Sequence, residues 1–123
     1  MDKKEQAVAL KHKGYNCAQA VLCVFQNEVG LSEETLKGMG AGFGAGMGSM
    51  EATCGALIGA GILSGLKESP GKPIRETAKK LHQTFAEKCG ATICKDIKGR
   101  DTGVAVCSCE GCVRHAVELV ENL

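Results

Sequence analysis

The sequence predicts an all-α protein, a compact single-domain bundle of about five to six helices around a glycine-rich, buried central helix. Apolar residues recur at helical spacing between residues that typically cap helices. Trp is absent, Tyr occurs once and Phe three times, so small aliphatic side chains must supply most of the core volume. Seventeen glycines allow helices to approach one another closely. The length of 123 residues is that of one domain, spanning residues 1–123.

The N-terminal third contains the signals of two helices. Asp2, with a glutamate three positions later, is typical of a capping box, and this helix is expected to end near Gly14. Asn16 and Gln19 form the same pattern at the start of a second helix. Its apolar face continues as far as Gly30, where it is expected to stop.

The middle of the chain is rich in glycine. Ser32, followed by two glutamates, opens a third helix. This helix runs into the glycine-rich segment 38–48. We expect this segment to be either a tightly packed helix or a loop that wraps around another part of the molecule or a ligand. Residues 52–66 are apolar with glycines at small-xxx-small spacing, and they predict the buried central helix.

The C-terminal half predicts two more helices. Pro73 suits the first position of a helix that reaches Cys89 and Gly90. Residues 97–106 are polar and contain glycine, so we expect a loop there. Ser108 caps a last helix with an apolar face.

Charge and hydropathy exclude several classes of function. The formal net charge is +1 without a basic stripe, which argues against nucleic-acid binding. Residues 52–66 would span only about 22 Å as a helix, short of a hydrocarbon core of about 30 Å, so we expect no stable membrane insertion. Residues 1–13 lack the apolar region of a secretory signal, which favours a cytoplasmic location and reduced thiols.

The eight cysteines carry the chemistry that the sequence predicts. Four of them stand at expected helix starts, where the helix dipole and unpaired N–H groups favour the thiolate: Cys17, Cys54, Cys94 and Cys109. Cys109 and Cys112 also have the C-x2-C spacing of metal ligands or of a redox disulfide. Cys23 and Cys89 fit better as small buried hydrophobic residues.

Several motifs together resemble a known family. These are the run of residues 14–21 around Cys17, the stretch Cys54–Gly59 with the sequence CGALIG, Cys94, and the terminal Cys109-x2-Cys112 pair. They resemble the C_GCAxxG_C_C family of four-cysteine proteins, which are described as redox-active. The resemblance implies that the four characteristic cysteines are Cys17, Cys54, Cys94 and Cys112, with Cys109 an equally placed neighbour of the last. Cys23, Cys89 and Cys107 then stand outside this set.

The first functional hypothesis is electron transfer through an iron–sulfur cluster of unspecified type. Its ligands would be the four cysteines that the resemblance implies. Backbone N–H groups of nearby glycines could donate to the cluster, with Gly55 permitting close approach of the chain and Gly59 completing the motif. Electron transfer also requires a redox partner protein, and a homodimer that shares ligands stays open.

The second hypothesis is a metal-free thiol–disulfide oxidoreductase or redox sensor. In it, a low-pKa Cys54 attacks and Cys17 or Cys112 resolves the mixed disulfide. A structural zinc site is a third and weaker alternative. The residues alone do not decide whether the chain is an enzyme.

Overall fold

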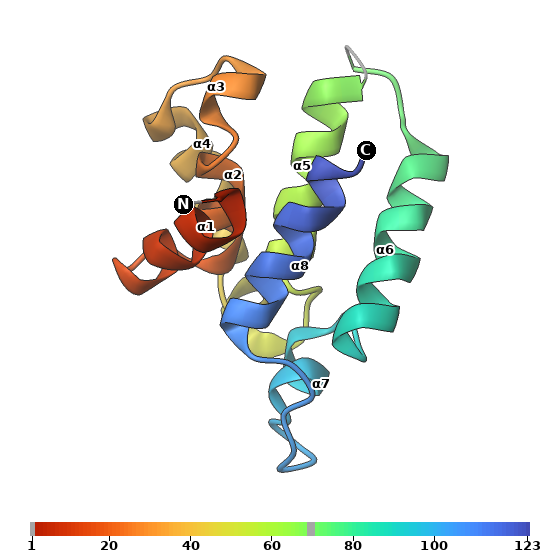
Figure 1. Ribbon diagram of the computed structural model, residues 1–123. Helices are drawn as coiled ribbons and strands as arrows, with labels where there is room; N and C mark the ends of the chain where they lie inside the picture. Colours follow the sequence, from red (N-terminus) through yellow and green to blue (C-terminus); the bar gives the residue numbers. More distant parts are fainter. Residues whose placement is uncertain (1, 69–70) are drawn as a thin grey trace.

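The computed structural model describes residues 2–68 and 71–123, and most of these residues are helical (Figure 1). A single isolated β-bridge pairs Thr53 with Ile93, and the described residues form no β-strand. The all-α prediction is therefore confirmed. The α-helices are α1 (Lys3–His12), α2 (Cys17–Cys23), α3 (Gln26–Val29), α4 (Glu33–Gly40), α5 (Gly55–Glu68), α6 (Arg75–Cys89), α7 (Cys94–Lys98) and α8 (Cys109–Glu121).

The predicted N-caps determine where four helices begin. Asp2, Ser32 and Ser108 each accept a hydrogen bond from the backbone N–H three residues later. Asn16 does the same with Gln19, whose side chain accepts from the Asn16 N–H to complete a capping box. Each cap satisfies a donor that the helix itself leaves unpaired, so these starts are set locally.

Three predicted boundaries are wrong. The loop expected at 97–106 begins later, because Ile97 and Lys98 belong to α7. The helix expected from Asn16 to Gly30 is two helices, because the chain leaves helical geometry at Phe25 and turns that ring into the core, where it is 1% exposed. Gly30, in the left-handed region, ends the second of these helices as expected. Pro73 does not begin α6, which starts at Arg75 after Ile74, a cap without a side-chain hydrogen bond.

The glycine-rich segment 38–48 leaves the α-helix at Gly40. A 3-10 turn (η1, Ala41–Phe43) and a π-type turn (η2, Gly46–Met50) follow, so the alternative of a continuous packed helix is wrong. Several residues of the second turn have positive φ, which the α-helix does not tolerate. The segment packs against the start of α7: a Cβ on Gly46 would lie 2.7 Å from the Cβ of Cys94.

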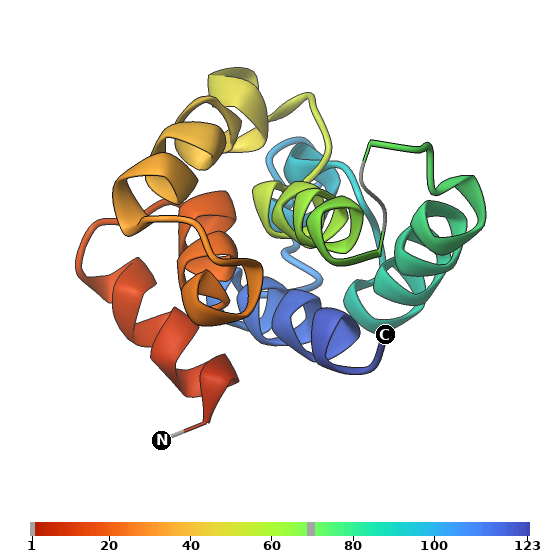
Figure 2. The same ribbon diagram turned by 90° about the horizontal axis from the view of Figure 1, so that it is seen from above.

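Helix α5 is the buried central helix that the sequence predicts. Figure 2 shows it among α2, α6 and α8. Its glycines bring α2 unusually close: a Cβ on Gly59 would lie 3.1 Å from the carbonyl oxygen of Ala18. At Gly55 a Cβ would lie 2.5 Å from the carbonyl oxygen of Phe43 and 3.3 Å from the amide nitrogen of Ala18. Both glycines of the CGALIG motif therefore allow the backbone of α5 to pack directly against neighbouring backbone segments.

In the described part of the chain, no helix combines the length and the apolar character that a membrane crossing requires. This finding agrees with the expectation that α5 is a core helix.

The contact at Gly55 predicts a stability difference between two glycines of the same helix. Gly55→Ala should destabilise the protein by about 1–3 kcal/mol, because its methyl group meets backbone atoms that cannot move aside. Gly61→Ala is the matched control, since a Cβ there has no neighbour within 4 Å, and it should stabilise α5 by about 0.5–1 kcal/mol. Urea unfolding would measure both, and equal midpoints for the two variants would contradict the close packing.

Candidate cysteine centre

Four cysteines lie at the starts of four different helices. Cys17, Cys94 and Cys109 are the first residues of α2, α7 and α8, and Cys54 immediately precedes α5. Helices α2, α5 and α8 all begin at the end of the molecule where α7 lies (Figure 1). The unpaired N–H groups and positive dipole ends of these helices thus surround one set of thiols. This placement confirms the expectation that the four cysteines stand at helix starts.

The isolated β-bridge positions two of these cysteines. It pairs Thr53 with Ile93 in antiparallel fashion. The N–H of Cys54 donates to the carbonyl of Thr92 at 2.8 Å, and the N–H of Cys94 donates back across the bridge at 3.0 Å. The starts of α5 and α7 are therefore held together by backbone hydrogen bonds.

Pairwise interactions link the four thiols in a closed series, called the ring below, although no three of these four sulfurs all lie within 4.8 Å of one another. The Cys17 thiol donates a hydrogen bond to the sulfur of Cys109. Cys17 also interacts electrostatically with Cys54, and Cys94 interacts with both Cys54 and Cys109. Cys54 and Cys94 are buried, whereas Cys17 and Cys109 are half-buried and form the accessible side of the ring.

Cys109 is held as a thiolate. The hydrogen bond from Cys17 and the ammonium group of Lys98, which also contacts the sulfur, lower the pKa of Cys109 to about 5, against an opposing effect of burial. Burial lowers the pKa of Lys98, but its hydrogen bond to Cys109 and its electrostatic interactions with Cys109, Cys17 and Cys94 outweigh this and raise the pKa. A stable thiolate–ammonium pair therefore lies at the accessible side of the ring.

The low pKa that the dithiol hypothesis assigned to Cys54 is not found. The hydrogen bond that Cys54 donates to Cys112, together with burial, raises the pKa of Cys54. The N–H groups of Ala56 and Leu57 donate to the Cys54 sulfur and lower the pKa, as a helix start should, but they do not outweigh the other two effects. Among the four cysteines at helix starts, Cys109 is the one whose pKa is lowered.

Cys112 lies in a second group of thiols. It donates to Cys89, and Cys89, Cys107 and Cys112 have sulfurs that all lie within 4.8 Å of one another. The hydrogen bond from Cys54 lowers the pKa of Cys112, but the bond to Cys89 and burial raise it overall. The two cysteines of α8 therefore differ in their surroundings. Cys109 belongs to the ring with Cys17 and Cys94, whereas Cys112 belongs to the second group and touches the ring only through Cys54.

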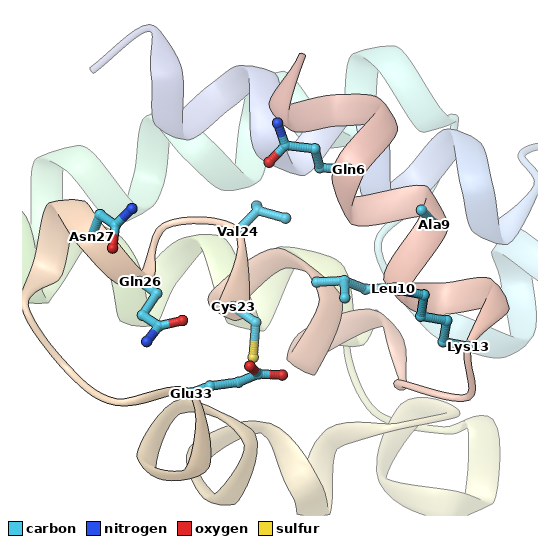
Figure 3. Close-up of a pocket in the computed structure, with 9 residues that line it drawn as sticks. All are labelled: Gln6, Ala9, Leu10, Lys13, Cys23, Val24, Gln26, Asn27 and Glu33. Atoms are coloured by element: carbon cyan, nitrogen blue, oxygen red, sulfur yellow. The ribbon is translucent and has the colours of Figure 1, made fainter. Parts of the chain in front are cut away.

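Cys23 is separate from both groups. It lines a pocket between α1 and the helices that follow, with its sulfur facing Glu33 (Figure 3). Burial and the negative charge of Glu33 raise the pKa of Cys23 to about 11. The prediction that Cys23 is a small buried residue agrees with this position, whereas Cys89 is buried but lies among other thiols.

Sequence reasoning missed Lys98 and the grouping of Cys89 with Cys107. Lys98 follows Cys94 by four residues on α7, so recognition of this short helix would have placed the two on one face. The grouping of Cys89 with Cys107 has no local signal, because the end of α6 and the segment before α8 meet only in the folded chain.

Comparison with known proteins yields one family match. The model of the family described as "Putative redox-active protein (C_GCAxxG_C_C)" matches residues 15–123. No curated protein and no solved structure matches the chain.

The thiolate–ammonium pair predicts a pH-dependent reactivity. Alkylation of Cys109 should follow a titration with a pKa near 5, so this thiol should react faster than Cys17 or Cys54 below neutral pH. Lys98→Gln removes the cation and should raise the apparent pKa of Cys109 by about 1 to 3 pH units.

Mass-spectrometric alkylation rates for each cysteine, measured against pH in metal-free protein, would test this. Lys95→Gln is the matched control, since Lys95 lies on the same short helix and is absent from the interactions that set the Cys109 pKa. An unchanged titration in Lys98→Gln would contradict the assignment.

Proposed function

The chain belongs to the C_GCAxxG_C_C family, and we propose that it transfers electrons through an iron–sulfur cluster held by Cys17, Cys54, Cys94 and Cys109. The observation that carries this proposal is the closed ring of four thiols delivered by four helix starts. Four thiolates are the usual ligand set of [2Fe–2S] and [4Fe–4S] clusters.

The surroundings of the ring fit such a centre. Backbone N–H groups already donate to the sulfur of Cys54, and hydrogen bonds of this kind stabilise sulfur ligands that carry negative charge. Lys98 supplies a positive charge beside three of the four thiols. Bound there, a cluster would accept and release single electrons.

The choice of Cys109 as the fourth ligand rests on its neighbours. Cys109 contacts Cys17 and interacts with Cys94, whereas the neighbours of Cys112 are Cys54, Cys89 and Cys107. The half-buried Cys17 and Cys109 would face a redox partner protein, while Cys54 and Cys94 lie on the buried side. All four proposed ligands come from one chain, so the proposed centre needs no second copy.

Replacing any one of the four ligands should remove most of the cluster. Each single Cys→Ser variant at residues 17, 54, 94 and 109 should lose most bound iron and sulfide and most visible charge-transfer absorbance after anaerobic purification. Cys23→Ser is the matched control, because Cys23 is buried but lies away from the ring, and it should keep both.

The metal analysis also separates the alternatives. Iron and sulfide retained in Cys109→Ser but lost in Cys112→Ser would reassign the fourth ligand. Zinc without iron would indicate a structural metal site, and protein without either metal would exclude the cluster.

A second candidate function is favoured by the Cys109 thiolate and its contact with Cys17. In metal-free protein, Cys109 would attack a disulfide of a partner, forming a mixed disulfide and releasing one partner thiolate, which takes a proton from water. Cys17 would then lose its proton and attack the Cys109 sulfur, forming the Cys17–Cys109 disulfide and releasing the second partner thiol. The partner disulfide gains two electrons, and the chain loses two.

This candidate predicts one specific disulfide. Incubation of metal-free protein with oxidised glutathione should yield a Cys17–Cys109 bridge in peptide mapping, and Cys17→Ser should trap glutathione on Cys109. A bridge formed preferentially between Cys54 and Cys112 would contradict this choice of the attacking thiol.

A further inference from the structure

The thiols of Cys89, Cys107 and Cys112 form a compact group outside the ring proposed above. Their sulfurs all lie within 4.8 Å of one another. Cys89 is 1% exposed and Cys112 is fully buried, while Cys107 is half-buried. We propose that this group is a second metal site that binds one thiophilic d10 cation, Zn²⁺ or Cu⁺, through three thiolates.

Three separate segments build this group. Cys89 is the last residue of α6, Cys107 lies in the segment before α8, and Cys112 is in the first turns of α8. The Val106 N–H donates to the carbonyl of Ile97 at 2.9 Å, which holds the segment before Cys107 against α7. The three sulfurs are therefore placed by tertiary structure.

Two glycines shape the space around these sulfurs. Gly90 ends α6 with φ of +84°, and a Cβ there would lie 3.4 Å from the side chain of Val106. A Cβ on Gly111 would lie 3.0 Å from the Cys107 sulfur. The Gly111 contact indicates that α8 packs closely against the Cys107 sulfur, whereas Gly90 supplies the left-handed backbone conformation that ends α6 beside Cys89.

The donor set determines which cations suit the site. Thiolates select soft or borderline cations such as Cu⁺ and Zn²⁺, and they bind hard cations such as Mg²⁺ poorly. With a Zn–S distance of about 2.3 Å, three sulfurs on one tetrahedral ion lie about 3.8 Å apart, which the observed 4.8 Å limit accommodates. In the described part of the chain, no fourth Cys, His, Asp or Glu has a ligand atom within 4.8 Å of all three sulfurs, although Cys54 donates a hydrogen bond to Cys112. Cu⁺ would be satisfied by three thiolates, whereas Zn²⁺ would take a water molecule from the side of Cys107.

The test begins from a variant that lacks the ring. Cys17→Ser/Cys109→Ser should still bind one equivalent of metal when the reduced, metal-free protein is titrated anaerobically with Zn²⁺ or with Cu⁺ against a competing chelator. Adding Cys107→Ser should weaken this binding at least about 100-fold, because one of three ligands is lost. Cys107 is the half-buried member, so its replacement disturbs the core least. Adding Cys23→Ser to the double variant is the matched control and should leave the affinity unchanged.

A second readout identifies the ligands directly. Bound metal should protect Cys89, Cys107 and Cys112 from alkylation in the double variant, and binding should release protons in proportion to the thiols engaged. The cation that binds with the higher affinity in these titrations is assigned to the site. Absence of one-equivalent binding of both cations, or equal affinity with and without Cys107→Ser, would overturn the proposal. Because the starting variant already lacks two ring cysteines, this result is independent of whether the ring holds an iron–sulfur cluster.

Discussion

The close approach of α2 and α5 is the constraint on which the rest of the structure depends. A Cβ on Gly55 would lie 3.3 Å from the amide nitrogen of Ala18, and a Cβ on Gly59 would lie 3.1 Å from the carbonyl oxygen of Ala18, both closer than an ordinary Cβ contact. Small residues suit this interface because they allow backbones to meet without a cavity, and a core poor in aromatic residues needs this kind of packing to reach native density. The contact also fixes where both helices begin relative to each other. Cys17 and Cys54 stand at those two beginnings, so the packing of the core places the first pair of thiols.

The remaining helix starts are brought to the same place by other means. The backbone hydrogen bonds of the Thr53–Ile93 bridge bind the start of α7 to that of α5. Helix α8 packs against α1, α5 and α6, and its capped start at Ser108 places Cys109 beside Cys17. Four positive helix ends and Lys98 then share one region with four thiols. Among the four thiols, the hydrogen bond from Cys17 and this positive charge lower the pKa of Cys109 alone. Thiol hydrogen bonds and burial raise the pKa of Cys17 and Cys54, and burial raises that of Cys94.

The two groups of thiols are adjacent and chemically different. One contact connects them, the hydrogen bond from Cys54 to Cys112. In the ring, the hydrogen bond from Cys17 and the charge of Lys98 stabilise the Cys109 thiolate, so Cys109 is ionised near neutral pH. In the second group, the hydrogen bond that Cys112 donates to Cys89, together with burial, raises the pKa of Cys112 and favours its neutral thiol.

Local features of the sequence determined most of the helices and the residues at their starts. Caps such as Asn16 and Ser108 act within one helical turn, so their effect is readable without knowledge of the fold. The same reasoning correctly placed Cys17, Cys54, Cys94 and Cys109 at helix starts and identified α5 as the buried helix. Only the tertiary structure decided the break at Phe25, the non-α turns of the glycine-rich segment and the extension of α7 to Lys98, because each follows from contacts with distant segments. It also decided which thiols are neighbours. In the sequence, Cys109 and Cys112 are equivalent members of a C-x2-C pair. In the folded chain, Cys109 lies beside Cys17 and Lys98, and Cys112 lies beside Cys54 and Cys89. The two residues lie one turn apart on α8, and different segments cover each turn.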